Sequence, residues 1–370
     1  MRILVFNWRD PTHPWAGGAE VFLYEVARRW VRWGHSVTWF CGRHESQPAD
    51  GQIEGIDVIR RGGIYSVYPA AALHYLSRLR GRFDVTLDSA NGIPFFTPLY
   101  TATPKVALVH HIHGEVFFCE LPWHLAGVGN ALERVGMPLV YCRTPFIAVS
   151  ESSRQALVDI GVRADQITVI HNGVDGSRYR PGAKSPLPLL VFVGRLRRYK
   201  SIDVAIRALP DLLRVVPDVR LSIVGSGPMA GALRDLAEEL GVAEHVCFHG
   251  FVSETVKIGL LQQAHVAINT SMKEGWGLTV LEANACGTPV VAANVSGLRD
   301  SVQDGETGLL VPHGDAGALA REVRALLLDD GRREQMAGNA VAWAARFDWD
   351  QTARSCLDLL SHCLEERERR

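Results

Sequence analysis

Residues 2–41 read RILVFNWRDPTHPWAGGAEVFLYEVARRWVRWGHSVTWFC, and this stretch indicates the class of fold. Its first segment, 2–8, is a short apolar run without polar alternation, which is typical of a strand buried on both faces. The segment 20–33 is interpreted as a helix that ends at Gly34, and the run 36–41 predicts a second strand. Strand, helix and strand in this order predict a parallel sheet covered by helices, an α/β fold.

The same rhythm continues outward from this stretch along the whole chain. Further strands are predicted at 84–90, 105–111, 146–150, 189–194, 220–225, 245–250, 265–271 and 289–294. Helices are predicted between the later strands, for example at 203–215 and 229–240. Residues 179–190, YRPGAKSPLPLL, contain three prolines and one glycine and are interpreted as a linker. At about 150 residues per domain, the 370 residues therefore predict two successive α/β domains.

Composition excludes several classes of protein. The 39 basic and 40 acidic side chains give a net charge of −1, which argues against a nucleic-acid binder that relies on bulk charge. The 7 cysteines include no C-x-x-C pair, which favours a reduced intracellular chain over a disulfide framework. The start MRILVFNWRD lacks a signal-peptide pattern, and no apolar run is long enough to span a bilayer. We therefore expect a cytoplasmic protein, with peripheral contact at the inner face of a membrane as an alternative.

Two glycine-rich turns are candidate phosphate sites. Gly17 and Gly18 stand between a predicted strand and helix, where they permit either close approach to a phosphate or simply a tight turn. Gly225 and Gly227 partly match a dinucleotide-binding fingerprint, but no acidic residue follows at the end of the next predicted strand. We interpret this second turn as a tight connection near a ligand rather than as a dinucleotide site.

A basic loop follows the predicted strand 189–193. Gly194 and Arg195 begin it, and Lys200 lies five residues after Arg195. Two cations at the carboxyl end of a buried strand are suited to clamping a diphosphate, because Arg forms paired hydrogen bonds and Lys supplies a point charge. The alternative is a solvated basic loop without function.

The strongest motif is SMKEGWGLTVLEANACGTPV at 271–290. Its loop contains Glu274, Gly275 and Gly277, and its helix contains Glu282. Glycines at a helix start expose backbone N–H groups to an anion, and carboxylates accept hydrogen bonds from sugar hydroxyls. The helix around Glu282 is otherwise apolar, so its carboxylate is expected to be buried and to need a partner.

Histidines gather where the predicted strand 105–111 ends. In a strand, His111 would face away from His110 and His113, and no H-E-x-x-H occurs, so a metal site is not favoured. A polar contact with substrate hydroxyls is the preferred interpretation. A separate basic and aromatic set on the predicted helix 20–33 could contact a membrane surface, although a solvated face with buried aromatics is favoured.

Taken together, several segments resemble glycosyltransferase family 4, whose members are retaining enzymes of GT-B fold. They are AGGAE (16–20), the strand that ends at His110, AVSESSR (148–154), HNGVD (171–175), VGRLRRYK (193–200), VGSGP (224–228) and SMKEGWGLTVLEANACGTPVVA (271–292). The resemblance runs from residue 1 to about residue 350. It implies two Rossmann-like domains facing across a cleft: an acceptor-binding domain, 1–180, and a donor-binding domain, 187–347. A terminal helix at about 348–366 crosses back to the first domain, with Trp349 at the crossing.

The resemblance also implies roles for individual residues. Catalytic roles fall to His110, Arg195, Lys200 and Glu274, with the two cations neutralising the donor diphosphate. The donor-binding residues are Gly17, Gly18, Gly194, Gly225, Val252, Glu274, Gly275, Trp276, Gly277, Leu278 and Glu282, with Val252 near the base and Glu282 on the ribose. His113 is an alternative to His110, and Asn172 is a further possible site residue. Trp276 and Leu278 depart from the commoner family sequence, so contacts with the donor sugar differ.

The implied function is retaining transfer of a hexose-type sugar from a UDP- or GDP-sugar to an acceptor hydroxyl. The setting would be bacterial glycoconjugate, polysaccharide or natural-product glycosylation, with a small-molecule, glycan or lipid-linked acceptor. We expect no metal and no cofactor besides the donor substrate, and no nucleic-acid partner. The alternatives are a sugar-nucleotide epimerase of the same fold and a non-catalytic protein that binds a nucleotide sugar or glycan.

Overall fold

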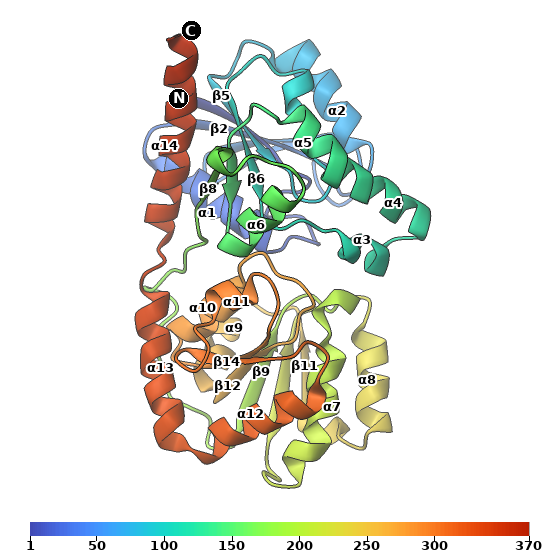
Figure 1. Cartoon of the computed structure of the whole chain (residues 1–370), viewed down its shortest axis with the longest axis vertical. Coiled ribbons are helices and arrows are strands. Elements are labelled where there is room, and N and C mark those ends of the chain that lie inside the picture. The colour runs from blue at the N-terminus through green and yellow to red at the C-terminus, as the bar shows by residue number, and fades with distance from the viewer. Residues whose placement is uncertain (370) are drawn as a thin grey trace. The chain divides into compact units, whose positions relative to one another are not determined.

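The computed structural model describes residues 1–369 and divides the chain into two compact units (Figure 1). Unit 1 consists of Met1–Gly173 and Trp349–Arg370, and unit 2 consists of Val174–Asp348. Each unit contains one mostly parallel sheet covered by helices, as the sequence predicts. Within residues 1–369, no helix is both long enough and apolar enough to cross a membrane.

The sheet of unit 1 has eight strands in the order β3-β4-β2-β1-β5-β6-β7-β8. Their bounds are β1 Arg2–Phe6, β2 Ser36–Cys41, β3 Asp50–Ile53, β4 Ile56–Arg60, β5 Val85–Ser89, β6 Lys105–Val109, β7 Phe146–Ala148 and β8 Ile167–Val169. Only β3, which pairs with β4 in a hairpin, runs antiparallel to its neighbour. Strands β1 and β5 pair in register from Ile3 with Val85 to Phe6 with Asp88.

Helices cover both faces of this sheet. They are α1 Gly18–Arg32, α2 Val67–His74, α3 Glu115–Glu120, α4 Trp123–Ala131, α5 Met137–Val140, α6 Glu151–Asp159 and α14 Trp349–Glu368. Two π-helical turns, η1 Tyr75–Leu79 and η3 Leu132–Gly136, extend α2 and α4, and a 3₁₀ turn, η2 Thr97–Leu99, lies between β5 and β6.

The predicted terminal helix is confirmed as α14, which packs against α1 within unit 1. The Trp30 indole N–H donates to the backbone oxygen of Ala353 at 2.9 Å. The Trp349 ring lies 6.0 Å from the Phe22 ring, in the edge-to-face arrangement that aromatic pairs favour. Apolar side chains on one face of α1 and of α14 are buried in this contact, which anchors residues 349–368 to unit 1.

The sheet of unit 2 has six parallel strands in the order β11-β10-β9-β12-β13-β14. Their bounds are β9 Leu189–Val193, β10 Arg220–Val224, β11 Val246–Gly250, β12 Val266–Asn269, β13 Val290–Ala293 and β14 Gly308–Val311. The helices are α7 Ile202–Leu213, α8 Ala230–Glu239, α9 Glu254–Gln263, α10 Leu278–Ala285, α11 Leu298–Ser301, α12 Ala316–Leu328 and α13 Asp330–Ala344. Short 3₁₀ turns, η4 Ala164–Gln166 in unit 1 and η5 Arg198–Lys200 and η6 Ala243–His245 in unit 2, complete the elements.

Some strand predictions need correction. Strands β3, β4, β8 and β14 are additional to those predicted, and β3, with the sequence DGQI, has no apolar run that could have revealed it. The predicted strand 105–111 ends at Val109, and the predicted strand 2–8 ends at Phe6. In both cases the strand ends at the last residue of the continuous apolar run, and the polar residues Asn7 and His110 follow directly.

Candidate functional site

Unit 2 places the predicted diphosphate-binding residues where its strand order reverses. Strand β9 has β10 and β11 on one side and β12, β13 and β14 on the other. In open α/β sheets, ligands bind beyond the carboxyl ends of the strands at such a reversal. Arg195 and Lys200 follow β9, and Glu274 follows β12, so all three belong to this edge.

Lys200 and Glu274 form a partly buried ion pair there. The Lys200 ammonium donates to Glu274 Oε1 at 2.5 Å, and the Ser271 hydroxyl donates to the same oxygen at 2.7 Å. Burial by itself lowers the pKa of Lys200, but the Glu274 carboxylate outweighs burial and the pKa is raised overall. Lys200 is therefore a fixed positive charge.

Arg195 is held beside this ion pair. Its guanidinium donates to the Tyr199 hydroxyl at 2.9 Å, and the Tyr199 ring lies 5.1 Å from the Lys200 ammonium. The Tyr199 backbone oxygen accepts the Met272 N–H at 2.7 Å, which ties the basic loop to the loop after β12. The structure thus brings both predicted cations to one place, and Tyr199 is an organising residue that the motif did not reveal.

Helix α10 begins at this edge through a glycine that no other residue can replace without strain. Gly277 caps the helix with φ of 82°, and a Cβ there would lie 2.9 Å from Ser301 Oγ. The first backbone N–H groups of a helix have no intrahelical acceptor, so Leu278 and Thr279 present donors at a positive helix end. Trp276, predicted to contact the donor sugar, is buried with its ring 5.2 Å from Phe347.

Glu282 is buried in α10, as the sequence predicts, and its partners come from elsewhere in unit 2. Its Oε1 accepts from the Lys257 ammonium at 2.9 Å and from the Tyr179 hydroxyl at 3.1 Å. Lys257 also pairs with Glu254 at 3.1 Å. Burial raises the pKa of Glu282 and outweighs the opposing effect of Lys257. The second oxygen, Oε2, is buried without a hydrogen-bond partner and remains available to a ligand.

Sequence reasoning anticipated a partner for Glu282 but did not identify it. Tyr179 lies in the segment interpreted as a linker, and Lys257 lies in α9. Neither belongs to a motif. The only available signal was the general need of a buried carboxylate for a partner.

The glycine turns after β9 and β10 pack directly on each other. A Cβ at Gly225, where φ is 134°, would lie 1.9 Å from the backbone oxygen of Gly194. The Gly194 N–H donates to the Val224 oxygen at 2.9 Å, and the Leu196 N–H donates to the Ser226 oxygen at 2.9 Å. Close backbone packing explains the Gly225–Gly227 turn. Val252 lies after β11 in the loop that leads to α9, partly exposed.

Unit 1 also reverses its strand order, between β1 and β5, and its predicted residues follow β1 and β6. Gly17 caps α1, and its N–H donates to Glu20 Oε2 at 2.7 Å. Gly18, the first residue of α1, has no heavy atom within 4 Å of an added Cβ. The Gly17 N–H at this helix end is thus already hydrogen-bonded within the chain, whereas the space beside the Gly18 Cα is not filled by other atoms of the chain.

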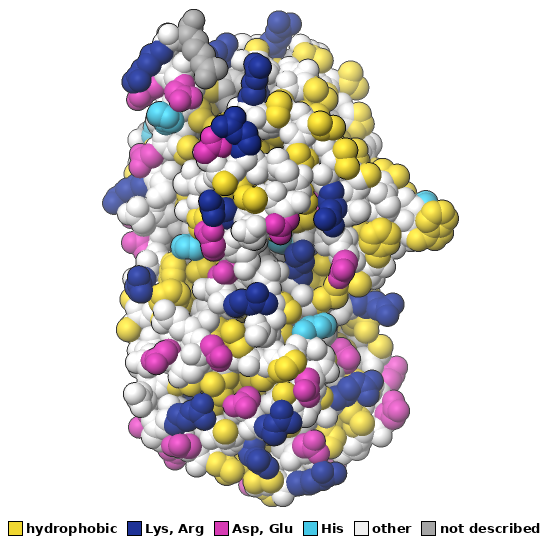
Figure 2. Space-filling model, viewed as in Figure 1, with side chains coloured by type: hydrophobic (Ala, Val, Ile, Leu, Met, Phe, Trp, Pro, Cys, Tyr) yellow, Lys and Arg dark blue, Asp and Glu magenta, His cyan; other side chains and the backbone are white. Residues whose placement is uncertain are grey.

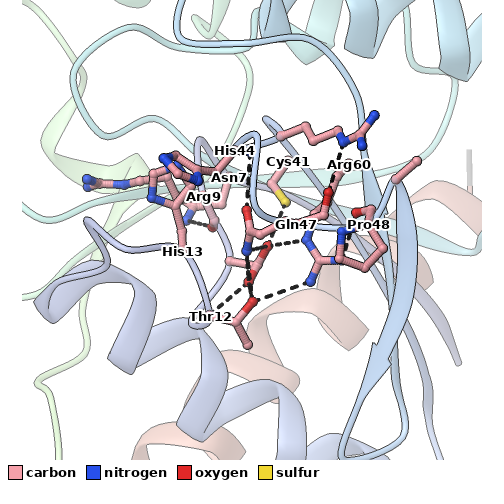
Figure 3. Close-up of polar contacts among 12 residues, drawn as sticks. Asn7, Arg9, Thr12, His13, Cys41, His44, Gln47, Pro48 and Arg60 are labelled. Atoms are coloured by element: carbon pink, nitrogen blue, oxygen red, sulfur yellow. Dashed lines mark hydrogen bonds and ion pairs between the residues drawn. The ribbon is translucent and has the colours of Figure 1, made fainter.

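A buried polar network supports the loop that leads from β1 to α1. Asp10 Oδ2 accepts from Arg60 Nε at 2.6 Å, and Gln47 Nε2 donates to the same carboxylate at 3.2 Å. Figure 3 shows Gln47, Thr12 and Arg60 converging from different segments. Burial would raise the pKa of Asp10, but the Arg60 and Thr12 hydrogen bonds outweigh it and lower the pKa. No sequence motif revealed this network, because Arg60 is 50 residues from Asp10.

His110 directly follows β6 and is buried. Its ring lies 5.3 Å edge-to-face from Phe22, and its backbone oxygen accepts the Ser153 hydroxyl at 2.6 Å. Its Nε2 atom is buried without a hydrogen-bond partner. Burial, with a smaller effect of His113, lowers the pKa of His110 to about 3. The ring is therefore neutral at physiological pH.

The prediction that His111 lies opposite His113 is wrong. Because β6 ends at Val109, strand alternation does not apply, and the two rings lie 4.3 Å apart. His113 is instead tied to buried Glu133, whose Oε1 accepts the His113 backbone N–H at 2.7 Å. Asn172 is buried with its Oδ1 unpartnered. Throughout the described part of the chain, no group of three His, Cys, Asp or Glu side chains is arranged to hold a metal ion.

Comparison with known proteins supplies the family. The family described as "Glycosyl transferases group 1" matches residues 177–343, and that described as "Glycosyltransferase Family 4" matches residues 16–178. D-inositol 3-phosphate glycosyltransferase of Xylanimonas cellulosilytica is 35% identical over 396 residues, 95% of this chain and 93% of that protein. The protein of that name from Acidothermus cellulolyticus is 40% identical over 236 residues, 57% of this chain. That match spans 51% of the relative, about half of its length.

Solved structures with similar folds include glycosyltransferases. Sucrose-phosphate synthase from Thermosynechococcus elongatus has a TM-score of 0.86 at 21% identity, covering 99% of each chain. Anabaena HepE in complex with UDP-glucose has a TM-score of 0.78 at 21% identity, covering 98% of this chain and 100% of that one. The predicted GT-B fold is thereby confirmed. With matches over both units and a relative similar along nearly its full length, this chain belongs to the group 1 glycosyltransferases of family 4.

Proposed function

We propose that the protein transfers a hexose-type sugar from a UDP- or GDP-sugar to an acceptor hydroxyl with retention of configuration. Unit 2 would bind the donor, and unit 1 would bind the acceptor. The observation that carries the proposal is the Lys200–Glu274 ion pair beside Arg195 and the open end of α10. HepE, a protein of similar fold, is described in complex with UDP-glucose, which supports a nucleotide-sugar donor.

The charges in unit 2 suit departure of a diphosphate. When the bond between the sugar's anomeric carbon and the phosphate oxygen breaks, negative charge grows on the diphosphate and positive charge on the sugar ring. Arg195, Lys200 and the first N–H groups of α10 would stabilise the first charge. We propose that these groups suffice without a metal ion. The Glu274 carboxylate forms an ion pair with Lys200 in this structure. It would accept hydrogen bonds from sugar hydroxyls once phosphate oxygens bind the Lys200 ammonium.

The remaining predicted residues would orient the donor. Glu282 would hold the ribose hydroxyls through Oε2, because Lys257 and Tyr179 fix its other oxygen. His110 would contact the reacting sugar as a neutral imidazole through Nε2. The acceptor hydroxyl would attack on the face that the diphosphate leaves, and its proton would pass to a phosphate oxygen of the leaving group.

The test is mass spectrometry of products after incubation with a panel of sugar nucleotides and acceptors. Lys200→Ala should lower the rate by about 10²–10³-fold, the loss expected when one donor to a developing oxyanion is removed. Arg198→Ala is the matched control, since Arg198 is an exposed cation of the same loop. It should retain the rate within about twofold.

Three results would contradict the proposal. Equal losses in both variants would indicate a solvated basic loop without a specific diphosphate contact. Donor conversion without an acceptor would indicate an epimerase. Donor binding without turnover across the panel would indicate a binding protein.

A further inference from the structure

Unit 1 exposes an unusually apolar edge formed by its later helices. More than half of the large hydrophobic side chains exposed among residues 1–369 lie between Ile64 and Leu139, about a fifth of the chain. Isolated exposed apolar side chains are ordinary, but a gathering of them marks an interaction surface. We define the apolar edge by eight residues: Leu73, Leu76, Leu99, Trp123, Leu125, Val128, Val135 and Leu139.

Five of the eight residues of the apolar edge lie along one continuous helical segment. Helix α4, the turn η3 and α5 run without interruption from Trp123 to Val140. Leu125, Val128, Val135 and Leu139 follow helical spacing and are exposed. Trp123, at the first turn, is 79% exposed, and Leu139 is 70% exposed. In water this exposure is unfavourable, so the outward face needs an apolar environment.

The inward face of the same segment explains why the helix does not rotate about its axis to bury these exposed side chains. Ala126, Gly129 and Met137 are buried, and Gly129 leaves room for the Phe117 ring, 3.2 Å from where its Cβ would lie. Glu133 is fully buried, and its Oε2 accepts the Gly114 N–H at 2.9 Å. This internal carboxylate fixes the rotation of the helix. The exposed leucines and valines are therefore held outward by the fold.

The remaining residues of the apolar edge adjoin this segment. The Phe96 ring, just before η2, lies 6.2 Å from Tyr141 and 3.2 Å from where a Cβ of Gly136 would lie. On its other side, Tyr100 lies 5.9 Å from Tyr75 at the start of η1. Leu99, the last residue of η2, thus lies between the segment α2–η1 and the segment α4–α5. Figure 2 shows hydrophobic side chains along the side of unit 1 where Figure 1 draws α2, α5 and α4.

Arginines outnumber acidic residues around the apolar edge, although α3, which contacts α4, carries Glu115 and Glu120. Residues 61–83 contain four arginines and no acidic residue, and residues 121–150 contain two arginines and only the buried Glu133. The exposed arginines are Arg78, Arg80, Arg82, Arg134 and Arg143. Among residues 1–369, no ion pair between side chains involves any of these five. Apolar side chains bordered by unpaired arginines match the interfacial region of an anionic bilayer.

We propose that the apolar edge seats unit 1 on an anionic lipid surface. The leucines, valines and Trp123 would enter the headgroup and acyl boundary, and the arginines would contact lipid phosphates. Helix α1, the other basic and aromatic helix, is less suitable. Its Trp30 is buried against α14, and its Arg29 pairs with Glu25 and Asp350. The proposal concerns a surface and does not depend on the proposed sugar transfer.

The test is flotation of the full chain with vesicles of phosphatidylcholine alone or with one quarter phosphatidylglycerol. Binding should require the anionic lipid and weaken as NaCl is raised. Trp123→Ser with Leu139→Gln should lower the partition coefficient by roughly tenfold or more. Both side chains are exposed, so folding should be retained, which circular dichroism checks. Leu328→Gln, at an exposed leucine of unit 2, is the matched control and should bind normally.

A direct readout comes from lipids brominated on the acyl chain. They should quench wild-type tryptophan fluorescence more than that of Trp123→Ser, because Trp123 would lie within reach of the bromines. The proposal is overturned if no vesicle binds the chain, or if binding survives the double substitution. It is also overturned if the substitutions abolish self-association on size-exclusion chromatography without changing vesicle binding, since a second copy would then cover the edge.

Discussion

The Lys257–Glu282 pair permits a quantitative test of how unit 2 tolerates a buried carboxylate. Lys257→Met replaces the ammonium, 2.9 Å from Glu282 Oε1, with an apolar chain of similar length. At an effective dielectric constant of ~20, the attraction at that distance is about 6 kcal/mol, much of which offsets desolvation of the two charges. Breaking a buried pair typically costs ~3–5 kcal/mol. We expect a loss of about 3 kcal/mol in the free energy of unfolding at pH 8.

The loss should depend on pH. Burial, the largest effect, raises the pKa of Glu282, and Glu254 raises it further, while Lys257 opposes both. Without Lys257 the pKa rises more. A carboxyl group whose pKa is higher in the folded state destabilises the fold as pH rises from the unfolded value through the folded value. The loss should therefore be smaller at pH 5 than at pH 8, because a larger fraction of Glu282 is protonated in the folded variant at the lower pH.

Urea unfolding at pH 5 and pH 8 measures both effects, and calorimetry checks which unit melts. For a unit of this size, 3 kcal/mol corresponds to a fall in Tm of about 6–12 °C. Arg214→Met is the control, because Arg214 pairs with Asp211 on the exposed surface, and it should cost under about 0.5 kcal/mol. A loss at pH 8 below about 1 kcal/mol, or equal losses at the two pH values, would refute this account of Glu282.

Two further predictions concern His110 and Gly225. His110 has a folded-state pKa of about 3, so its ring should stay neutral down to pH 5 in ¹⁵N NMR, and a titration near 6.5 would contradict this. Because the folded pKa is depressed, this residue should cost stability as pH falls below 6.5, by about 1.4 kcal/mol per pH unit. Replacing it, as in His110→Gln, should remove that slope from urea unfolding curves. Gly225→Ala would place a Cβ 1.9 Å from a backbone oxygen at positive φ and should destabilise unit 2 by ~3 kcal/mol or more. Gly231→Ala, in α8 with no atom near, should be neutral or stabilising in the same thermal melts, and equal effects would disprove the packing argument.

The sequence by itself determined the α/β class, most of the strands and the family. Short apolar runs separated by helical segments permit few architectures, and local composition is enough to recognise them. The sequence also placed Arg195, Lys200 and Glu274 in loops that follow predicted strands, and the family resemblance assigned the three residues to one site. Glycine-opened helix α10 was predictable because a cap is a local property of a few residues.

Only the tertiary structure decided the partners of the buried charges and which faces of the apolar helices are exposed to solvent. Lys257 and Tyr179 reach Glu282 from other segments, and Arg60 reaches Asp10 across the sheet of unit 1. Such pairings depend on which strands are neighbours in the sheet, and the hydropathy pattern within a single segment does not encode that order. The segment α4–α5 resembles a core helix by composition, yet buried Glu133 turns its leucines and valines outward. Hydropathy predicts that a side chain prefers burial, whereas packing decides whether the fold provides it.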